Sequence, residues 1–111
     1  MPRYKMIVLS NPVEGREAEY NDWYQNIHLA QVISIKGFQS AQRFRLTTSL
    51  VEGEVKPYLA IYEIETNDVE SVIQDLRKLA EAGSLLVSDT LDIEHVHAAV
   101  YEELGPAVAK L

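Results

Sequence analysis

Segments with β-strand character alternate with segments of helical periodicity along this chain, in the order β-α-β-β-α-β. Residues 4–9 (YKMIVL), 38–47 (FQSAQRFRLT) and 58–65 (YLAIYEIE) are rich in β-branched and aromatic residues, and a last strand is expected over 91–104. This order predicts a ferredoxin-like α+β fold, in which a four-stranded antiparallel sheet carries two helices on one face. The 111 residues, 1–111, are expected to form a single domain.

The two expected helices show apolar residues at three- and four-residue spacing. In the first, predicted from Arg16 to Ser34, the apolar stripe consists of Tyr20, Trp23, Tyr24, Ile27 and Ala30. The second follows a capping-box pattern at Asn67 and Glu70 and ends at Gly83, a residue suited to the position after a helix C-terminus.

Both faces of the predicted sheet carry apolar residues. In the strand 58–65, one alternation is Tyr58, Ala60, Tyr62 and Ile64, and the other contains Leu59 and Ile61. In the strand 38–47, the expected faces are Phe38, Ser40, Gln42, Phe44 and Leu46 against Gln39, Ala41, Arg43 and Arg45. Two helices cover only one face of a sheet, so a homodimer with the two sheets packed together is expected.

Charge and composition narrow the classes of partner and cofactor. Acidic residues outnumber basic ones by 17 to 10, which gives a net charge of −7 and disfavours binding to nucleic acid or anionic membrane. No stretch approaches the roughly 18 apolar residues of a membrane span. The chain has no cysteine, so a disulfide framework is excluded, and a cytoplasmic location is expected. No dinucleotide or phosphate-binding motif is present, and we expect no cofactor.

The run EYNDWYQNIHLAQVISIKGFQSAQRFRL resembles the helix-plus-strand signature of the dimeric α+β barrel superfamily, and within it the EthD-type group, named for ethyl tert-butyl ether degradation. The pattern is an aromatic pair, a histidine one turn later, and a Gly-Phe pair entering a strand with an arginine. Here it is supplied by Trp23, Tyr24, His28, Gly37, Phe38 and Arg43. Lys36 stands where the family usually has proline before the glycine.

The resemblance implies a dimeric barrel with a cavity between the sheet and the first helix of each subunit. The superfamily includes polyketide cyclases, muconolactone-type isomerases, small lyases and haem- or quinol-dependent monooxygenases, so the fold alone does not select a reaction.

His28 is the candidate catalytic residue, because it lies at the edge of the first helix's apolar stripe, one turn after Tyr24. An imidazole there is suited to general acid–base work near neutral pH. The alternative is a boundary histidine that packs on Tyr24 and bonds a carbonyl.

The other candidates are expected to bind substrate. Arg43, with Arg45 on the same strand face, is suited to binding a carboxylate or enolate oxygen, unless both arginines pair with Glu19 or Asp22. The hydroxyls of Tyr4, Tyr58 and Tyr62 lie in neighbouring strands and are suited to orienting an oxygenated substrate.

His95 and His97 are placed on one face of the last strand, where either His97 or His95 is suited to be a second proton donor. The alternative is that they pair across strands or line the cavity wall. A metal site completed by His28 is the minor alternative, and no metal is expected.

These residues support two functions of different class. The first is a cofactor-independent acid–base enzyme (cyclase, isomerase or lyase) that uses His28 on a small apolar oxygenated metabolite, with Tyr24, Tyr4, Arg43, Tyr62 and His97 binding it. The second is a non-catalytic metabolite- or haem-binding module. A cofactor-independent monooxygenase shares the site of the first and differs by consuming oxygen.

Overall fold

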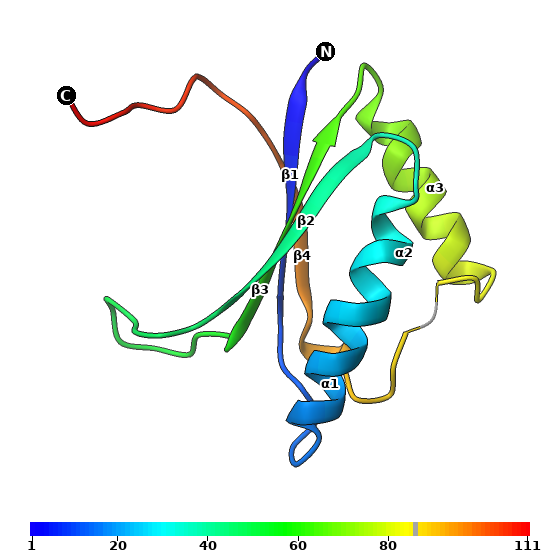
Figure 1. Cartoon of the computed structure of the whole chain (residues 1–111), viewed down its shortest axis with the longest axis vertical. Helices are drawn as coiled ribbons and strands as arrows, with labels where there is room; N and C mark the ends of the chain where they lie inside the picture. The colour runs from blue at the N-terminus through cyan, green and yellow to red at the C-terminus, as the bar shows by residue number, and fades with distance from the viewer. Residues whose placement is uncertain (86) are drawn as a thin grey trace.

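A four-stranded antiparallel sheet in the order β2-β3-β1-β4 forms the centre of the molecule, with helices on one face only (Figure 1). The computed structural model describes residues 1–85 and 87–111. The strands are β1 (Arg3–Ser10), β2 (Phe38–Arg45), β3 (Tyr58–Glu65) and β4 (His97–Glu102). The predicted ferredoxin-like α+β arrangement is therefore confirmed.

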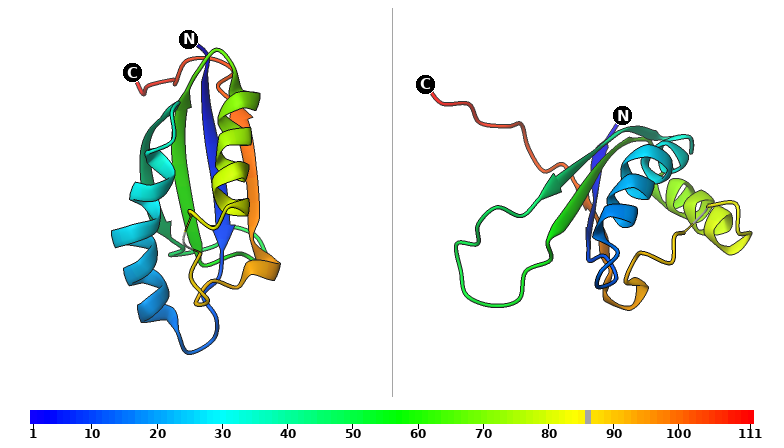
Figure 2. Two further views of the ribbon diagram at one scale, coloured as in Figure 1. Left: turned by 90° about the vertical axis from the view of Figure 1, so that its right-hand side faces the viewer. Right: turned by 60° about the horizontal axis from the view of Figure 1, so that its bottom comes forward.

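Helical segments cover the sheet from one side (Figure 2). The first run is continuous but has three parts, namely α1 (Glu17–Trp23), a π-helical stretch η1 (Tyr24–His28) and α2 (Leu29–Ile33). The second helix is α3 (Val69–Glu81), and a short 3₁₀ turn η2 (Ile93–His95) precedes β4. No helix in the described ranges 1–85 and 87–111 is long and apolar enough to cross a membrane.

The π-helical stretch changes which residues of the first helix face the core. The N–H of Leu29 bonds to the carbonyl of Tyr24, five residues back, as in a π-helix. Of the predicted stripe, Tyr20, Trp23 and Tyr24 are buried, whereas Ile27 is 44% exposed and Ala30 is exposed. The wider turn rotates the helix, so the buried positions resume at Leu29 and Val32. The prediction for Ile27 and Ala30 was wrong for this reason.

A β-bulge in β2 corrects the predicted faces of that strand. The register shifts between Phe38 and Ser40. Phe38 therefore joins Ala41 and Arg43 on the helix-covered face, where they lie opposite Ile64, Tyr62 and Ala60 of β3. Phe38 is buried in the core. Arg43 points toward the helices, where it meets the aromatic rings of the first helix.

The ends of two elements also differ from the prediction. The last strand begins at His97 and not at Leu91, because Asp92 turns the chain: its carboxylate contacts His95 Nδ1 at 2.8 Å and its carbonyl accepts from the His95 N–H. The N-cap of α3 is Asp68 rather than Asn67, and its carboxylate accepts from the Ser71 N–H at 3.1 Å. Gly83 follows the helix with φ +72°, as expected.

The face of the sheet opposite the helices is apolar at its centre. Ile7 pairs with Ile61, and Leu9 with Leu59, on this open face. Phe44 stands beside Leu59 and is 41% exposed. The β2–β3 loop and the C-terminal segment both extend toward this side (Figure 1). We refer to the side of the sheet that carries Ile7, Leu9, Phe44, Leu59 and Ile61 as the open face.

Candidate functional site

Arg43 lies between β2 and α1, enclosed by aromatic rings. Its guanidinium carbon is 4.6 Å from the ring centre of Tyr24, 5.3 Å from that of Tyr58 and 5.5 Å from that of Tyr20. The guanidinium donates to Asn21 Oδ1 at 2.7 Å and to the Asn21 carbonyl at 3.4 Å. None of the ion pairs in the described part of the chain involves Arg43. A cation held by neutral partners retains its attraction for an anion.

The hydrogen bonds around Arg43 run in one direction. Arg43 donates to Asn21, the Asn21 amide donates to the Tyr58 hydroxyl at 3.0 Å, and Tyr58 donates to Glu17 Oε2 at 2.5 Å. Because each residue in this series donates a hydrogen bond to the next one, the donor and acceptor roles of all four residues are fixed. The expected pairing of Arg43 with Glu19 or Asp22 does not occur: Glu19 bonds to Arg16, and Asp22 accepts from Asn26.

A cavity of 350 Å³ opens beside this chain of hydrogen bonds. This volume falls in the range of small-molecule sites. Its lining combines both arginines of β2 with polar residues of α1 and η1 and with two aromatic rings: Asn21, Gln25, Arg43, Phe44, Arg45 and Tyr58. Phe44 belongs to the open face as well, so the cavity reaches from the helix side around the edge strand β2.

His28 packs against the same aromatic group from the next turn of the helix. Its ring stacks on Trp23 at 4.6 Å between centroids and meets Tyr24 edge-on at 4.9 Å. Its Nδ1 atom is buried without a hydrogen-bond partner among the described residues. Burial lowers the pKa of His28 to about 4, so the imidazole is neutral at pH 7. His28 does not line the cavity. It is connected to Arg43 through Tyr24, whose ring contacts both the His28 ring and the Arg43 guanidinium.

Tyr24 and Tyr62 bring two further hydroxyls to the buried side of Arg43. Burial raises the pKa of Tyr24 to about 12, and the hydrogen bond with Tyr62 opposes this rise. Burial also raises the pKa of Tyr62 far above its ordinary value. Both are protonated at neutral pH and act as hydrogen-bonding groups only. Of the predicted site residues, the structure therefore brings His28, Tyr24, Arg43 and Tyr62 together.

Tyr4 and His97 lie elsewhere. Tyr4 is opposite Ile64 and lines a separate hollow of 210 Å³ with Glu63 and Glu65. His97 is exposed and pairs with Leu9 on the open face, on the other side of the sheet from His28. The prediction that His95 shares a strand face with His97 was wrong, because His95 lies in the η2 turn. In residues 1–85 and 87–111, no group of three ligating side chains is close enough to hold a metal ion.

Sequence reasoning did not identify three residues of the α1 side, Glu17, Asn21 and Gln25. Their spacing of four places them on one helical face next to Tyr20 and Tyr24, and this was the signal available. Tyr58 was recognised only as one of several strand tyrosines, although its hydroxyl is central to the hydrogen bonds.

The fold is shared with solved structures of low sequence identity. An ethyl tert-butyl ether degradation (EthD) family protein from Bacillus halodurans superposes with a TM-score of 0.60 at 18% identity, covering 94% of this chain and 100% of that one. A proposed monooxygenase from Shewanella loihica gives a TM-score of 0.57 at 17% identity, covering 96% of this chain and 99% of that one. No family model and no curated protein sequence matches the chain. These similarities establish the fold and leave the reaction open.

Proposed function

We propose that the cavity beside Arg43 binds a small, largely apolar molecule through an oxygen that carries or develops negative charge. The protein acts on this molecule as a cofactor-independent acid–base enzyme. The observation that carries this proposal is the Arg43 guanidinium, which is enclosed by three tyrosine rings and hydrogen-bonded to two neutral residues, Asn21 and Tyr20. Cyclase, isomerase and lyase reactions that remove a proton next to a carbonyl pass through such an oxyanion.

The surroundings of Arg43 suit an oxyanion better than a neutral oxygen. A guanidinium has five N–H donors in a planar fork, so donors remain for a ligand oxygen beside those used by Asn21 and Tyr20. The aromatic rings around Arg43 lower the local polarity, which strengthens the attraction between the cation and an oxyanion. The preorganised cation therefore favours the transition state in which negative charge appears on oxygen.

The sequence predicts His28 as the catalytic residue, but its ring lies outside the cavity lining. In this proposal it therefore acts on the site only through Tyr24, which contacts both His28 and Arg43. With a pKa of about 4 it is also a weak base at pH 7. Tyr24 and Tyr62 are buried behind Arg43 and do not line the cavity, and Tyr4 and His97 lie outside this group.

The binding step is tested with a probe that contains both features of the proposed ligand. We would measure binding of 2-naphthoate by saturation-transfer NMR to the wild type and to Arg43→Gln. The loss of a charge-assisted hydrogen bond is expected to weaken binding at least ~10-fold. Arg77→Gln, an exposed residue of α3, is the matched control and should bind as the wild type does. Equal affinity of Arg43→Gln and wild type would refute the proposal.

A non-catalytic binding module is the second candidate, and the low pKa of His28 favours it. A histidine that is neutral and outside the cavity is not placed for efficient proton abstraction. Such a module would bind a metabolite or haem stoichiometrically without converting it. Native mass spectrometry of the purified protein would reveal a retained ligand, and a haem would add a Soret band. Oxygen uptake with a bound aromatic substrate would instead indicate monooxygenase activity.

We also propose that two copies pack through their open faces to form a homodimer. The apolar pairs Ile7–Ile61 and Leu9–Leu59 lie at the centre of this face, and the β2–β3 loop and C-terminal segment extend past it (Figure 2). These four side chains are half-buried, and a contiguous apolar surface that remains partly accessible is typical of interfaces. Because Phe44 lines the cavity from this side, the partner would also close the cavity.

Light scattering after size-exclusion chromatography tests the dimer. The wild type is expected at twice the chain mass of 12.5 kDa, and Ile61→Lys is expected at the monomer mass, because it places a charge in the apolar centre. Gln74→Lys, exposed on α3, adds the same charge on the other side and should remain dimeric. A monomeric wild type would exclude the sheet-packed dimer.

A further inference from the structure

Tyr58 has the geometry of a proton-transferring group. It lines the 350 Å³ cavity, and its hydroxyl proton is directed at Glu17 Oε2, 2.5 Å away. The Tyr58 hydroxyl oxygen also accepts a hydrogen bond from the Asn21 amide, so both the donor and the acceptor role of this hydroxyl are determined. A tyrosine required only for packing does not need a carboxylate at this distance.

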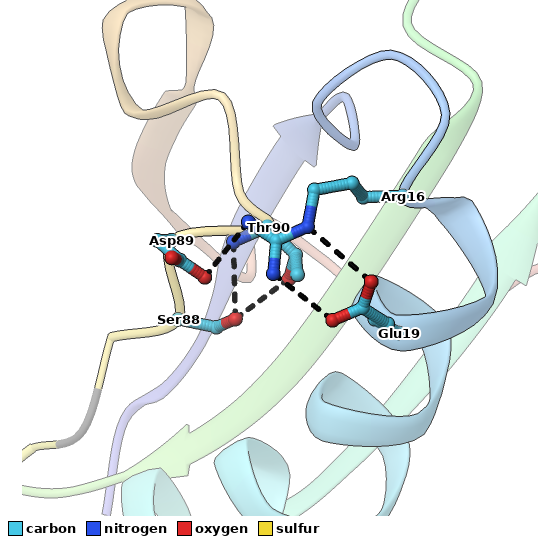
Figure 3. A network of polar contacts seen from close by, with 5 residues as sticks. All are labelled: Arg16, Glu19, Ser88, Asp89 and Thr90. Atoms are coloured by element: carbon cyan, nitrogen blue, oxygen red, sulfur yellow. Dashed lines mark hydrogen bonds and ion pairs between the residues drawn. The ribbon is translucent and has the colours of Figure 1, made fainter.

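Glu17 is exposed and opens the α1 helix, so protons can exchange between its carboxylate and water. Arg16, directly before α1, links the start of the helix to residues 88–90 through an ion pair with Asp89 at 3.0 Å. It also pairs with Glu19 of the first helical turn at 2.9 Å (Figure 3). Ser88 and Thr90 are hydrogen-bonded to each other in the same network. This fixation holds Glu17 over Tyr58, which is itself fixed in β3.

We infer that Tyr58, backed by Glu17, removes the proton from a carbon next to the carbonyl of the ligand whose oxygen faces Arg43. The inference rests on the proposed function for the position of the ligand. It adds the proton acceptor that the cavity needs, because His28 lies outside the cavity lining. Tyr58 is the catalytic residue, and Glu17 is a positioning residue that acts through it.

The step balances without any further reactant. The C–H bond of the ligand breaks, and its proton forms a bond to Tyr58 Oη, while the phenolic proton of Tyr58 passes to Glu17 Oε2. The electron pair of the C–H bond moves into the ligand to form an enolate, whose oxygen is held by Arg43. Reversal of the transfer from Glu17 through Tyr58 returns a proton to the same or another carbon, which yields exchange or isomerisation.

Exchange of carbon-bound hydrogen with solvent tests this step directly. The probe is 1-tetralone in D₂O, an apolar aryl ketone whose hydrogens next to the carbonyl are followed by NMR. The wild type is expected to accelerate their replacement by deuterium. Tyr58→Phe and Glu17→Gln are expected to lower the accelerated rate ~10²-fold or more, while their binding of the probe stays within a few-fold. Glu14→Gln, an exposed carboxylate on the preceding turn, is the control and should exchange as the wild type does.

The kinetic parameters separate proton transfer from a structural effect. Glu17→Gln should lower the maximal exchange rate, while the probe concentration that gives half the maximal rate stays within a few-fold of the wild-type value. Because Tyr58→Phe removes a hydrogen bond next to the core, its folding is checked by circular dichroism. Glu17→Gln, altered at the exposed end, keeps the test valid even if Tyr58→Phe fails to fold.

The outcomes distinguish this inference from the proposed function. If Arg43→Gln loses binding and exchange while Tyr58→Phe and Glu17→Gln keep full exchange, the proton pair is wrong and the oxyanion site stands. If exchange is lost only on replacing His28, the proton acceptor is His28 and this inference is overturned. If the wild type neither binds nor exchanges the probe, both the site and the pair are refuted.

Discussion

The buried imidazole of His28 predicts a specific dependence of stability on pH. Its pKa is about 4 in the folded protein against 6.5 for an unperturbed histidine, because burial disfavours the charged form. Between these two values the unfolded chain binds more protons than the folded one, so acid favours unfolding. The contribution is fully present above pH 6.5 and is lost as the pH falls toward 4.

The magnitude follows from the difference between the two pKa values. At 1.36 kcal/mol per pKa unit, the full contribution is about 3 kcal/mol, of which about 2 kcal/mol is lost between pH 7 and pH 5. His28→Phe keeps an aromatic ring against Trp23 and Tyr24 and has no titratable group. Its stability should therefore fall by about 2 kcal/mol less than that of the wild type over this range.

Urea unfolding at fixed protein concentration, in half-unit steps of pH from 5 to 7, measures this difference. His95 and His97 are present in both proteins, so their contributions cancel in the comparison. The same is true of Glu19 and Glu63, whose pKa values are lowered by the neighbouring Arg16 and Lys5. If the free energies of unfolding of the wild type and His28→Phe change with pH in parallel, the imidazole is not buried in its neutral form. The low pKa assigned to His28 would then be wrong.

Two further predictions concern stability. Gly37→Ala should destabilise the fold by about 1–3 kcal/mol, because Gly37 has φ +104° and an added Cβ would lie 2.6 Å from Val72 Cγ2; thermal unfolding measures the loss, and a loss that is no smaller in the Val72→Ala background would exclude the steric part of this explanation. Asp68→Ala removes the carboxylate that accepts from the Ser71 N–H and should cost about 0.5–2 kcal/mol in urea unfolding, whereas Asp68→Asn should keep most of the stability. An Asn variant as unstable as the Ala variant would argue against capping.

The sequence was sufficient for the order of the elements and for three of the residues that line the cavity, Arg43, Arg45 and Tyr58. Alternation in 58–65 and helical periodicity in 69–80 arise from local residues, and both elements lie where they were predicted. Tyr24, His28 and Arg43 were placed near one another by the family resemblance, and the structure brings them into one aromatic group.

The parts that were missed depend on one-residue shifts. A π-helical stretch and a β-bulge each insert one residue into a regular pattern, and everything beyond it is displaced to another face. Ile27 and Phe38 moved for this reason, although the local composition around them is ordinary. Glu17 was missed for a different reason. It matters because it accepts a hydrogen bond from Tyr58, which is 41 residues away in the sequence, and only the folded structure shows this contact.

Phe44 belongs at once to the cavity lining and to the open face. If a second copy covers that face, ligand binding and subunit association share a side chain and become thermodynamically linked. A ligand that holds Phe44 in the arrangement preferred by the dimer then tightens association, and association raises ligand affinity by the same factor. The measured affinity for a ligand would consequently vary with protein concentration, and titrations carried out above and below the dimer dissociation constant would report two different values.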